Sequence, residues 1–451
     1  MRSLLLVVAG IVLVVVLIEA SDAFAAESPS HDVGFAKVDI TPGYNMRLSG
    51  FAARQQESVG VREPIFARAM AIRGQVGSEP VVLVTVESIG VPMFVRDEVA
   101  SRLHGKRQIA NERFALCSTH SHTTPALDKV LPTLFGAPVP AEEQQRIARY
   151  TRELTDKIEQ AALAALDDMR PARLAYGIGN VGFSINRRTR GGPVDHDLPV
   201  MAVTDENGKI RGVWTNYACH CVVLSDLKVS GDWAGYGAKE LERIFPDCVA
   251  CISIGCGADS NPQSGVTGDK GEVAEKYGHE VATEVERAVH SSMTPIADDV
   301  VCQLAKIELP LAAIPTREEW VERAKQPSYP GYYARVELAR LDAGEKLPTE
   351  IPFVVQSWKF GKTLACVFLS GEVVVDYSLR LKKECDASRL WVNAYSNDVP
   401  CYVPSERVLK EGGYEGGGAM VYYGWPAAFA PGLEDKIVGA VGSQLGEQFR
   451  R

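Results

Sequence analysis

Histidine is scarce in this chain, and three of its eight histidines lie just after short apolar runs. His120 and His122 follow residues 114–118, and His220 follows residues 212–218. In an extended chain, a spacing of two places the His120 and His122 imidazoles on the same side. Imidazoles at strand ends can bind a metal ion or transfer protons near neutral pH. The alternative is that they are hydrogen-bonded histidines of a polar turn or, for His220, of the core.

A catalytic zinc site needs three or four nitrogen and oxygen ligands and an open position for water. Glu372 is the candidate carboxylate, because it follows the apolar residues 364–369 and precedes the apolar residues 373–375. A charge in such surroundings needs a partner. The alternative for Glu372 is a carboxylate at the N-terminus of a helix, where the helix dipole favours it.

The ten cysteines give a weaker signal. Cys248, Cys251 and Cys256 have a spacing that metal and redox sites also use. However, residues 249–254 have the pattern of a buried strand, in which these side chains would face different ways. We therefore expect these cysteines to be core residues or to form disulfide bonds, which are possible in an exported chain.

The hydrophobic pattern alternates between strands and helices without an internal repeat. Strands are predicted at residues 35–40, 80–88, 114–118, 173–179, 200–204, 212–218, 249–254, 300–309, 353–358 and 364–369. Helices are predicted at residues 93–109, 141–168, 271–290 and 433–449. No segment is rich enough in Pro, Gly or Ser to divide the chain. The pattern predicts one large α/β domain, with a mixed β-sheet core and flanking helices.

Composition and charge exclude several classes of protein. The chain is 46% hydrophobic and 23% charged, as folded globular proteins are. Its 48 basic and 57 acidic residues give a net charge of −9. An acidic chain of this kind lacks the basic face that a nucleic-acid-binding protein needs, so no nucleic-acid partner is expected.

Residues 1–26 have the pattern of a secretory signal peptide. Arg2 supplies the positive charge, residues 4–18 form an apolar run, and Ala23 and Ala25 fit a cleavage site. We therefore expect export to the periplasm or the extracellular space. The alternative is an uncleaved N-terminal membrane anchor, although the run is shorter than the ~20 apolar residues of a spanning helix.

Several short motifs occur together in a fixed order. They are residues 35–41 (FAKVDIT), 118–123 (STHSHT), 216–220 (NYACH), 230–236 (SGDWAGY), 371–372 (GE), and Tyr402 followed by Tyr414. In these motifs the sequence resembles the neutral (non-lysosomal) ceramidase family, specifically its zinc-bearing amino-terminal domain. The resemblance runs from about Phe35 to the carboxyl end, so residues 27–451 are expected to form a ceramidase-like catalytic domain.

The resemblance implies a role for each matching residue. It implies one zinc ion per chain, held by His120, His220, Glu372 and Tyr402. It also implies four catalytic residues: His122 and Tyr414 beside the metal, Arg187 at the oxyanion, and Ser260. The turn around Ser260 departs from the family, because residues 257–262 read GADSNP where the family has Gly-Asp-x-Ser-Pro-Asn. Arg188 and Arg190 are close enough in sequence to take the place of Arg187.

Each implied residue also has a structural alternative. Tyr402 could be a buried tyrosine with a satisfied hydroxyl, and Tyr414 an aromatic anchor of a glycine-rich loop. Arg187 could belong to a solvated basic patch. Ser260 could cap a helix, since residues 259–262 (DSNP) suit a helix N-terminus.

The leading hypothesis is an exported zinc-dependent amidohydrolase that cleaves the N-acyl bond of ceramide or a ceramide-like lipid, with peripheral membrane contact. One alternative is a metallo-esterase or amidase with a non-lipid substrate. Another is a non-catalytic binding protein that retains the metal. A long apolar groove beside the metal would favour a lipid, and a shallow polar pocket would favour the first alternative.

Overall fold

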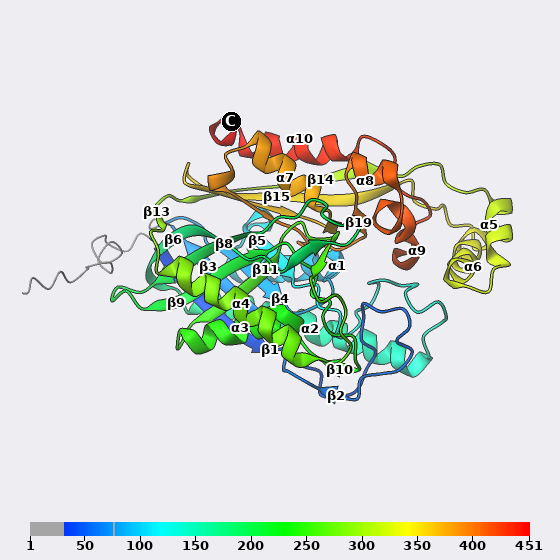
Figure 1. Ribbon diagram of the computed structural model, residues 1–451, viewed down its shortest axis with the longest axis horizontal. Coiled ribbons are helices and arrows are strands. Elements are labelled where there is room, and N and C mark those ends of the chain that lie inside the picture. Colours follow the sequence, from blue (N-terminus) through cyan, green and yellow to red (C-terminus); the bar gives the residue numbers. More distant parts are fainter. Residues whose placement is uncertain (1–30, 75–76) are drawn as a thin grey trace, which may run out of the picture.

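Two β-sheets packed face to face form the centre of the protein (Figure 1). The computed structural model describes residues 31–74 and 77–451, so the signal peptide predicted at residues 1–26 lies outside the described residues. Within these ranges, no helix has both the length and the apolar character needed to cross a bilayer.

The larger sheet is mixed and has the order β11-β9-β8-β6-β1-β3-β4-β5, with β13 also paired to β6. Its strands are β1 (His31–Asp39), β3 (Phe66–Arg73), β4 (Val81–Val86), β5 (Phe114–Ser118), β6 (Arg170–Asn180), β8 (Asp197–Thr204), β9 (Ile210–Tyr217), β11 (Val249–Ile254) and β13 (Thr294–Ile296). β4 pairs with β5 and β9 with β11 in parallel, and the other neighbours are antiparallel. The strands predicted at residues 200–204 and 212–218 form the antiparallel pair β8–β9.

The smaller sheet has the order β14-β15-β16-β18. Its strands are β14 (Val300–Pro310), β15 (Glu350–Phe360), β16 (Leu364–Leu369) and β18 (Leu390–Asn393). Alternation along each strand sends every second side chain between the sheets. There Trp214 of the larger sheet stacks on Trp391 of the smaller one, with ring centroids 4.0 Å apart. This aromatic layer joins the two sheets into one core.

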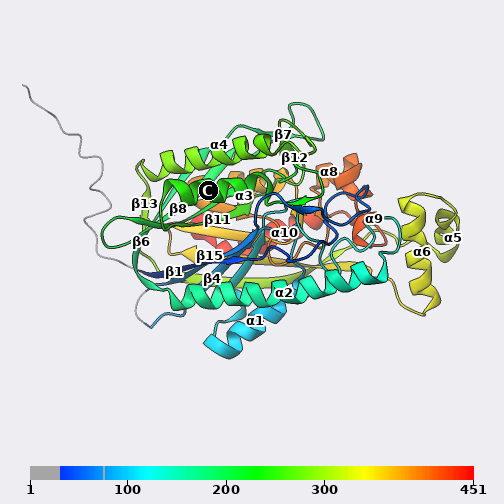
Figure 2. The ribbon, with the colours of Figure 1, turned by 90° about the horizontal axis from the view of Figure 1, so that it is seen from below.

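Helices cover the outer face of each sheet, which confirms the predicted α/β architecture with flanking helices (Figures 1 and 2). The larger sheet is covered by α1 (Met93–Arg107), α2 (Ala141–Asp167), α3 (Asp232–Ile244) and α4 (Gly271–Val289). The smaller sheet is covered by α7 (Val375–Glu384) and α10 (Leu433–Leu445). The last predicted helix is shorter than expected because Gly446, at φ +74°, ends α10.

A helical hairpin that the sequence did not predict projects from one end of the molecule (Figure 1). It consists of α5 (Arg317–Ala324) and α6 (Tyr329–Asp342), between β14 and β15. Most of its surface is charged, so only a weak apolar periodicity marks it in the sequence. Trp320 and Tyr333 form a small core of their own.

Short elements at the ends of the long strands build the functional site. They are β2 (Gly60–Val61), β7 (Ser184–Asn186), β10 (Lys228–Val229), β12 (Ser260–Pro262), β17 (Glu372–Val373), β19 (Tyr402–Val403), α8 (Glu406–Glu411), the π-helical turn Tyr414–Gly418 and α9 (Met420–Tyr423). Their pairings are local: β2 with β10, β7 with β12, and β17 with β19.

All ten cysteines lie among the described residues and are free thiols, nine of them buried. Cys251 lies within β11, between the two sheets, whereas Cys248 and Cys256 belong to the core on the helical side. They do not converge on a common point, so the prediction that they are core residues agrees with the structure.

One half-buried carboxylate links the start of α1 to the loop that leads to Tyr402. Pro92, the N-cap of α1, has no capping side chain, and Asp398 takes that role by accepting hydrogen bonds from the Met93 and Val399 backbone N–H groups at 3.0 and 2.9 Å. Burial raises the pKa of Asp398 to about 7. The folded protein therefore keeps a proton on a group that an unfolded chain releases near pH 4.

Asp398→Asn should remove part of the pH dependence of stability. The free energy of unfolding of the wild type should fall as pH rises from about 4 to about 7, because unfolding then releases the Asp398 proton. The asparagine oxygen keeps the capping role but does not titrate. Denaturant unfolding measures the free energy of unfolding at pH 5 and at pH 8. The change in this free energy between the two pH values should be smaller in the variant than in the wild type, by on the order of 2 kcal/mol. Asp342→Asn, on the exposed hairpin, is the matched control, and equal pH dependence in wild type and Asp398→Asn would contradict the assignment.

Candidate metal centre

Three imidazoles meet at the ends of the strands of the larger sheet. His120, His122 and His220 place their ligand atoms within 4.8 Å of one another. The Nε2 atoms of His120 and His122 are 3.1 Å apart. Each Nδ1 atom faces a backbone carbonyl oxygen: His120 faces Ile89 at 2.6 Å, His122 faces Gly50 at 3.0 Å, and His220 faces Gly257 at 3.0 Å. The Nδ1 atoms are therefore the donors, and every Nε2 presents a lone pair to the centre.

Backbone contacts between two loops bring the histidines together. Ser121 forms a parallel bridge with Cys221, and the His122 N–H donates to the Cys221 carbonyl at 3.0 Å. His120 has a left-handed backbone, with φ +56°. The predicted convergence of His120 and His122 is therefore correct, but it depends on a bent chain and not on an extended one. Such a conformation is costly for a non-glycine residue and is often found at functional sites.

Glu372 lies between two of these imidazoles. Its Oε2 is 3.1 Å from His120 Nε2 and 3.2 Å from His220 Nε2. The side chain is buried, and Oε2 has no hydrogen-bond donor among the described residues. The alternative that Glu372 serves a helix N-terminus does not hold, because its carboxylate faces the histidines.

Tyr402 lies beside Glu372 because β17 and β19 pair in parallel with these two residues in register. The turn before Glu372 requires a glycine: Gly371 has φ +78°, and a Cβ there would lie 2.8 Å from the Cys401 carbonyl oxygen. The Tyr402 hydroxyl is 3.2 Å from His220 Nε2 and accepts a hydrogen bond from Arg187 at 3.1 Å.

The four predicted ligands fit a divalent cation. Burial, reinforced by the charge of Arg187, lowers the pKa of His220 to about 4, so its imidazole is neutral at pH 7. The Nε2 atoms of His120 and His220 thus face the Glu372 carboxylate at 3.1 and 3.2 Å, which is unfavourable without a cation between them. Imidazole, carboxylate and phenol donors suit zinc.

His122 belongs to the same cluster but has a different exposure. Burial and the two neighbouring histidines lower its pKa well below the usual value, so it is also neutral. Unlike His120 and His220, it lines a cavity, where the Phe51 ring lies 5.1 Å from it. His122 is therefore the histidine that a molecule in the cavity would meet.

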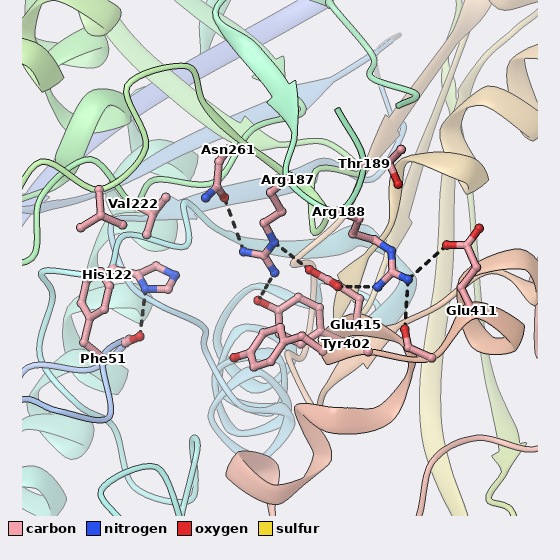
Figure 3. Close-up of a pocket in the computed structure, with 15 residues that line it drawn as sticks. Phe51, His122, Arg187, Arg188, Thr189, Val222, Asn261, Tyr402, Glu411 and Glu415 are labelled. Atoms are coloured by element: carbon pink, nitrogen blue, oxygen red, sulfur yellow. Dashed lines mark hydrogen bonds and ion pairs between the residues drawn. The ribbon is translucent and has the colours of Figure 1, made fainter. Parts of the chain in front are cut away.

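The cavity next to the centre has a volume of about 690 Å³ and a mixed lining (Figure 3). Phe51, Val222 and His122 lie on one side of it, and Arg188 and Glu411 lie on the other. It is neither a long apolar groove nor a purely polar pocket. A substrate with one apolar and one polar portion fits this lining.

Arg187 lies at the middle of the cavity, between the centre and Glu415. Its Nε donates to Glu415 at 2.7 Å, and its guanidinium lies 5.5 and 5.6 Å from the centres of the Tyr402 and Tyr414 rings. Burial opposes the charge, but Tyr402 and Glu415 raise the pKa of Arg187 above its ordinary value. Arg187 is thus a permanent cation in contact with Tyr402.

The other two arginines differ from Arg187, because Arg188 lies on the far side of the cavity and Arg190 does not line it. Arg188 donates to Glu415 at 2.6 Å and to Glu411 at 3.2 Å, and Arg190 is exposed and does not line the cavity. The solvated-patch alternative does not describe Arg187, which is half-buried and bound on three sides.

Tyr414 stands at the mouth of the cavity, in the π-helical turn. Its ring lies 5.1 Å from that of Tyr402, and it is 46% exposed. It is therefore near the centre and accessible to a bound molecule.

Ser260 is the predicted catalytic residue that the structure places apart from the cavity. It is fully buried in β12, does not line the cavity, and its Oγ has no hydrogen-bond partner in the described part of the chain. Its backbone carbonyl accepts the His220 N–H at 3.0 Å. The helix-cap alternative is wrong for Ser260, because Asp259 accepts the Val375 N–H at the start of α7.

Sequence reasoning missed two tyrosines beside the centre. The Tyr423 hydroxyl donates to Glu372 Oε1, and the Tyr395 ring lies 4.5 Å from that of His120. Neither residue belongs to a motif with a mechanistic spacing. Only their place in the fold identifies them.

Comparisons with known proteins identify a matching family model and two similar folds. Residues 31–250 match the family model described as neutral/alkaline non-lysosomal ceramidase, N-terminal. The crystal structure of neutral ceramidase from Pseudomonas aeruginosa is similar, with a TM-score of 0.72 and 18% identity over 92% of this chain and 74% of that one. A structure described as ceramidase complexed with C2 has a TM-score of 0.73 and 17% identity over 92% and 76% of the two chains. At these identities the two structures show a shared fold.

His120→Ala should weaken metal binding. Removing one of the nitrogen ligands should lower the affinity for zinc by at least about 100-fold, since even residues that only support ligands contribute 10–100-fold. Competition with a chromogenic chelator measures the Kd, and elemental analysis measures the zinc content. His279→Ala, on the exposed surface of α4, is the control. Unchanged zinc content in His120→Ala would refute the ligand assignment.

Proposed function

We propose, from the premise that the chain belongs to the neutral/alkaline ceramidase family, that the protein is a zinc-dependent amidohydrolase that cleaves the N-acyl bond of ceramide or a ceramide-like lipid. The single observation that carries this proposal is the convergence of His120, His220, Glu372 and Tyr402 beside a cavity. We also propose that residues 1–26 direct export.

The metal would complete the chemistry of the site. Zinc bound by His120, His220, Glu372 and Tyr402 would polarise the scissile carbonyl and lower the pKa of a water molecule towards ~7. The residues of this chain would then orient the substrate and move the protons.

His122 is the proposed general base and acid. Its Nδ1 is held by the Gly50 carbonyl, so its Nε2 faces the centre, 3.1 Å from His120 Nε2. A neutral imidazole at this position can accept a proton from the attacking water. The same nitrogen can then return the proton to the leaving amine, which must be protonated before the C–N bond breaks.

Arg187 and Tyr414 are the proposed donors to the oxyanion. Arg187 keeps its charge and is fixed by Glu415, so its position needs little reorganisation when negative charge develops. Tyr414 carries a phenolic hydroxyl at the cavity mouth, next to the Tyr402 ring. Donors fixed in this way are each worth several kcal/mol, in order of magnitude, of transition-state stabilisation.

The cavity lining supports an amphipathic substrate. Phe51, Val222 and Val266 would contact an apolar chain, and Thr189 and Asn261 would face polar groups. A lipid substrate also implies peripheral contact between the cavity mouth and a lipid surface. The polar half of the lining favours, as a second candidate, a metallo-esterase or amidase with a non-lipid substrate. A protein that retains its metal without catalysis would not need the His122 imidazole in the lining of the cavity.

His122→Gln should abolish most of the turnover while zinc remains bound. Loss of the proton-transfer group should lower kcat by about 10²–10⁴-fold on an N-acylsphingosine. Product release is measured by chromatography, and zinc content is measured in the same samples. Parallel assays on a short-chain N-acyl amide and on an acyl ester separate the two candidate functions. Hydrolysis of the small substrates alone would refute the lipid assignment, and zinc binding without any hydrolysis would refute the catalytic proposal.

Ser260→Ala should keep kcat within about threefold of the wild type. The hydroxyl does not reach the cavity and has no base as a partner in the described part of the chain, so it cannot be activated as a nucleophile. Steady-state kinetics on the N-acylsphingosine test this point. A loss of 100-fold or more with normal thermal stability would instead establish a serine route.

A further inference from the structure

Glu372 is held by a second residue that none of the sequence motifs contains. The Tyr423 hydroxyl donates a hydrogen bond to Glu372 Oε1, whereas Glu372 Oε2 faces the Nε2 atoms of His120 and His220. Both Glu372 and Tyr423 are buried. The two carboxylate oxygens therefore have different partners: one has a phenol and the other has the metal centre.

We propose that Tyr423 is a positioning residue that fixes the Glu372 carboxylate so that Oε2 alone is presented to the metal. This inference rests on the proposed function, because it concerns the same metal centre. A hydrogen bond from a phenol to a carboxylate is charge-assisted and directional, so it opposes rotation of the carboxylate. Partners of this kind orient metal ligands, and their loss typically costs 10–100-fold in metal affinity.

The position of Tyr423 is itself fixed by contacts around α9. The Thr133 hydroxyl donates to the Val421 carbonyl, and the Trp425 indole N–H donates to the Pro400 carbonyl at 2.7 Å. The Tyr333 hydroxyl of α6 donates to the Trp425 carbonyl. These bonds tie α9 to the loop before Tyr402 and to the projecting hairpin. The Tyr423 phenol is therefore held against Glu372 from outside the site.

The chain offers a matched control for this hydrogen bond. Tyr422 precedes Tyr423 in α9, but its ring contacts Tyr329 and Tyr414, and it does not touch Glu372. Removing its hydroxyl changes the same helix without changing the carboxylate. Trp425→Phe provides a second variant, because it removes the bond to the Pro400 carbonyl that holds α9 in place.

The test measures metal binding on the full-length protein. Tyr423→Phe should weaken zinc binding 10–100-fold in chelator competition and change the visible absorption spectrum of the cobalt-substituted protein. Trp425→Phe should weaken binding by a smaller factor, and Tyr422→Phe should behave as the wild type. In the Glu372→Gln background, Tyr423→Phe should have no further effect, because its partner carboxylate is gone. Thermal unfolding of the metal-free proteins checks that each variant is folded.

The outcomes separate the inference from the proposed function. If the wild type binds no zinc, the proposed function fails and the inference fails with it. If the wild type binds zinc and Tyr423→Phe has an unchanged Kd and cobalt spectrum, only the inference is overturned, whatever the effect of Trp425→Phe. An equal loss in Tyr422→Phe, or a full additional loss in the Glu372→Gln background, would also overturn it.

Discussion

The arrangement of the site depends on one constraint: the fold holds imidazole nitrogens and a carboxylate, all hydrogen-bond acceptors, close to one another. Imidazole lone pairs of His120 and His220 face the Glu372 carboxylate at 3.1 and 3.2 Å, inside the protein, with no donor between them among the described residues. In a folded chain such an arrangement is unfavourable unless a cation occupies the centre. The surrounding fold must therefore oppose the electrostatic repulsion that a bound cation would relieve.

Backbone contacts provide most of the constraints that hold these groups together against their repulsion. Carbonyl oxygens of residues 50, 89 and 257 hold the three Nδ1 atoms, so each ring has one orientation and one tautomer. The register of β17 and β19 sets Glu372 beside Tyr402. The donors that remain are side chains: Arg187 at the phenol of Tyr402 and Tyr423 at the carboxylate. Rigid elements thus position the ligands, and a few directional bonds set the direction of their lone pairs.

The cavity links this centre to a substrate. His122 is the one member of the histidine cluster that lines it, and Arg187 lies between the centre and the polar side. The two lining chemistries match a molecule with an apolar chain and a polar head, which is the character of an N-acylated lipid. Burial opposes the charged form of both Arg187 and His122. Tyr402 and Glu415 outweigh burial at Arg187, which stays charged, whereas the neighbouring histidines reinforce it at His122, which stays neutral.

The sequence by itself determined the α/β alternation, most of the long strands and helices, and the identity of the histidines and of Glu372, because these features depend on local periodicity and on residue type. The resemblance added Tyr402, Tyr414 and Arg187. Only the tertiary structure decided that Ser260 faces away from the cavity and that Tyr423 supports Glu372. In both cases the residues concerned are about 40 or more positions apart in the sequence. The directions of their side chains follow from strand register and loop conformation, which leave no periodic signal in the sequence.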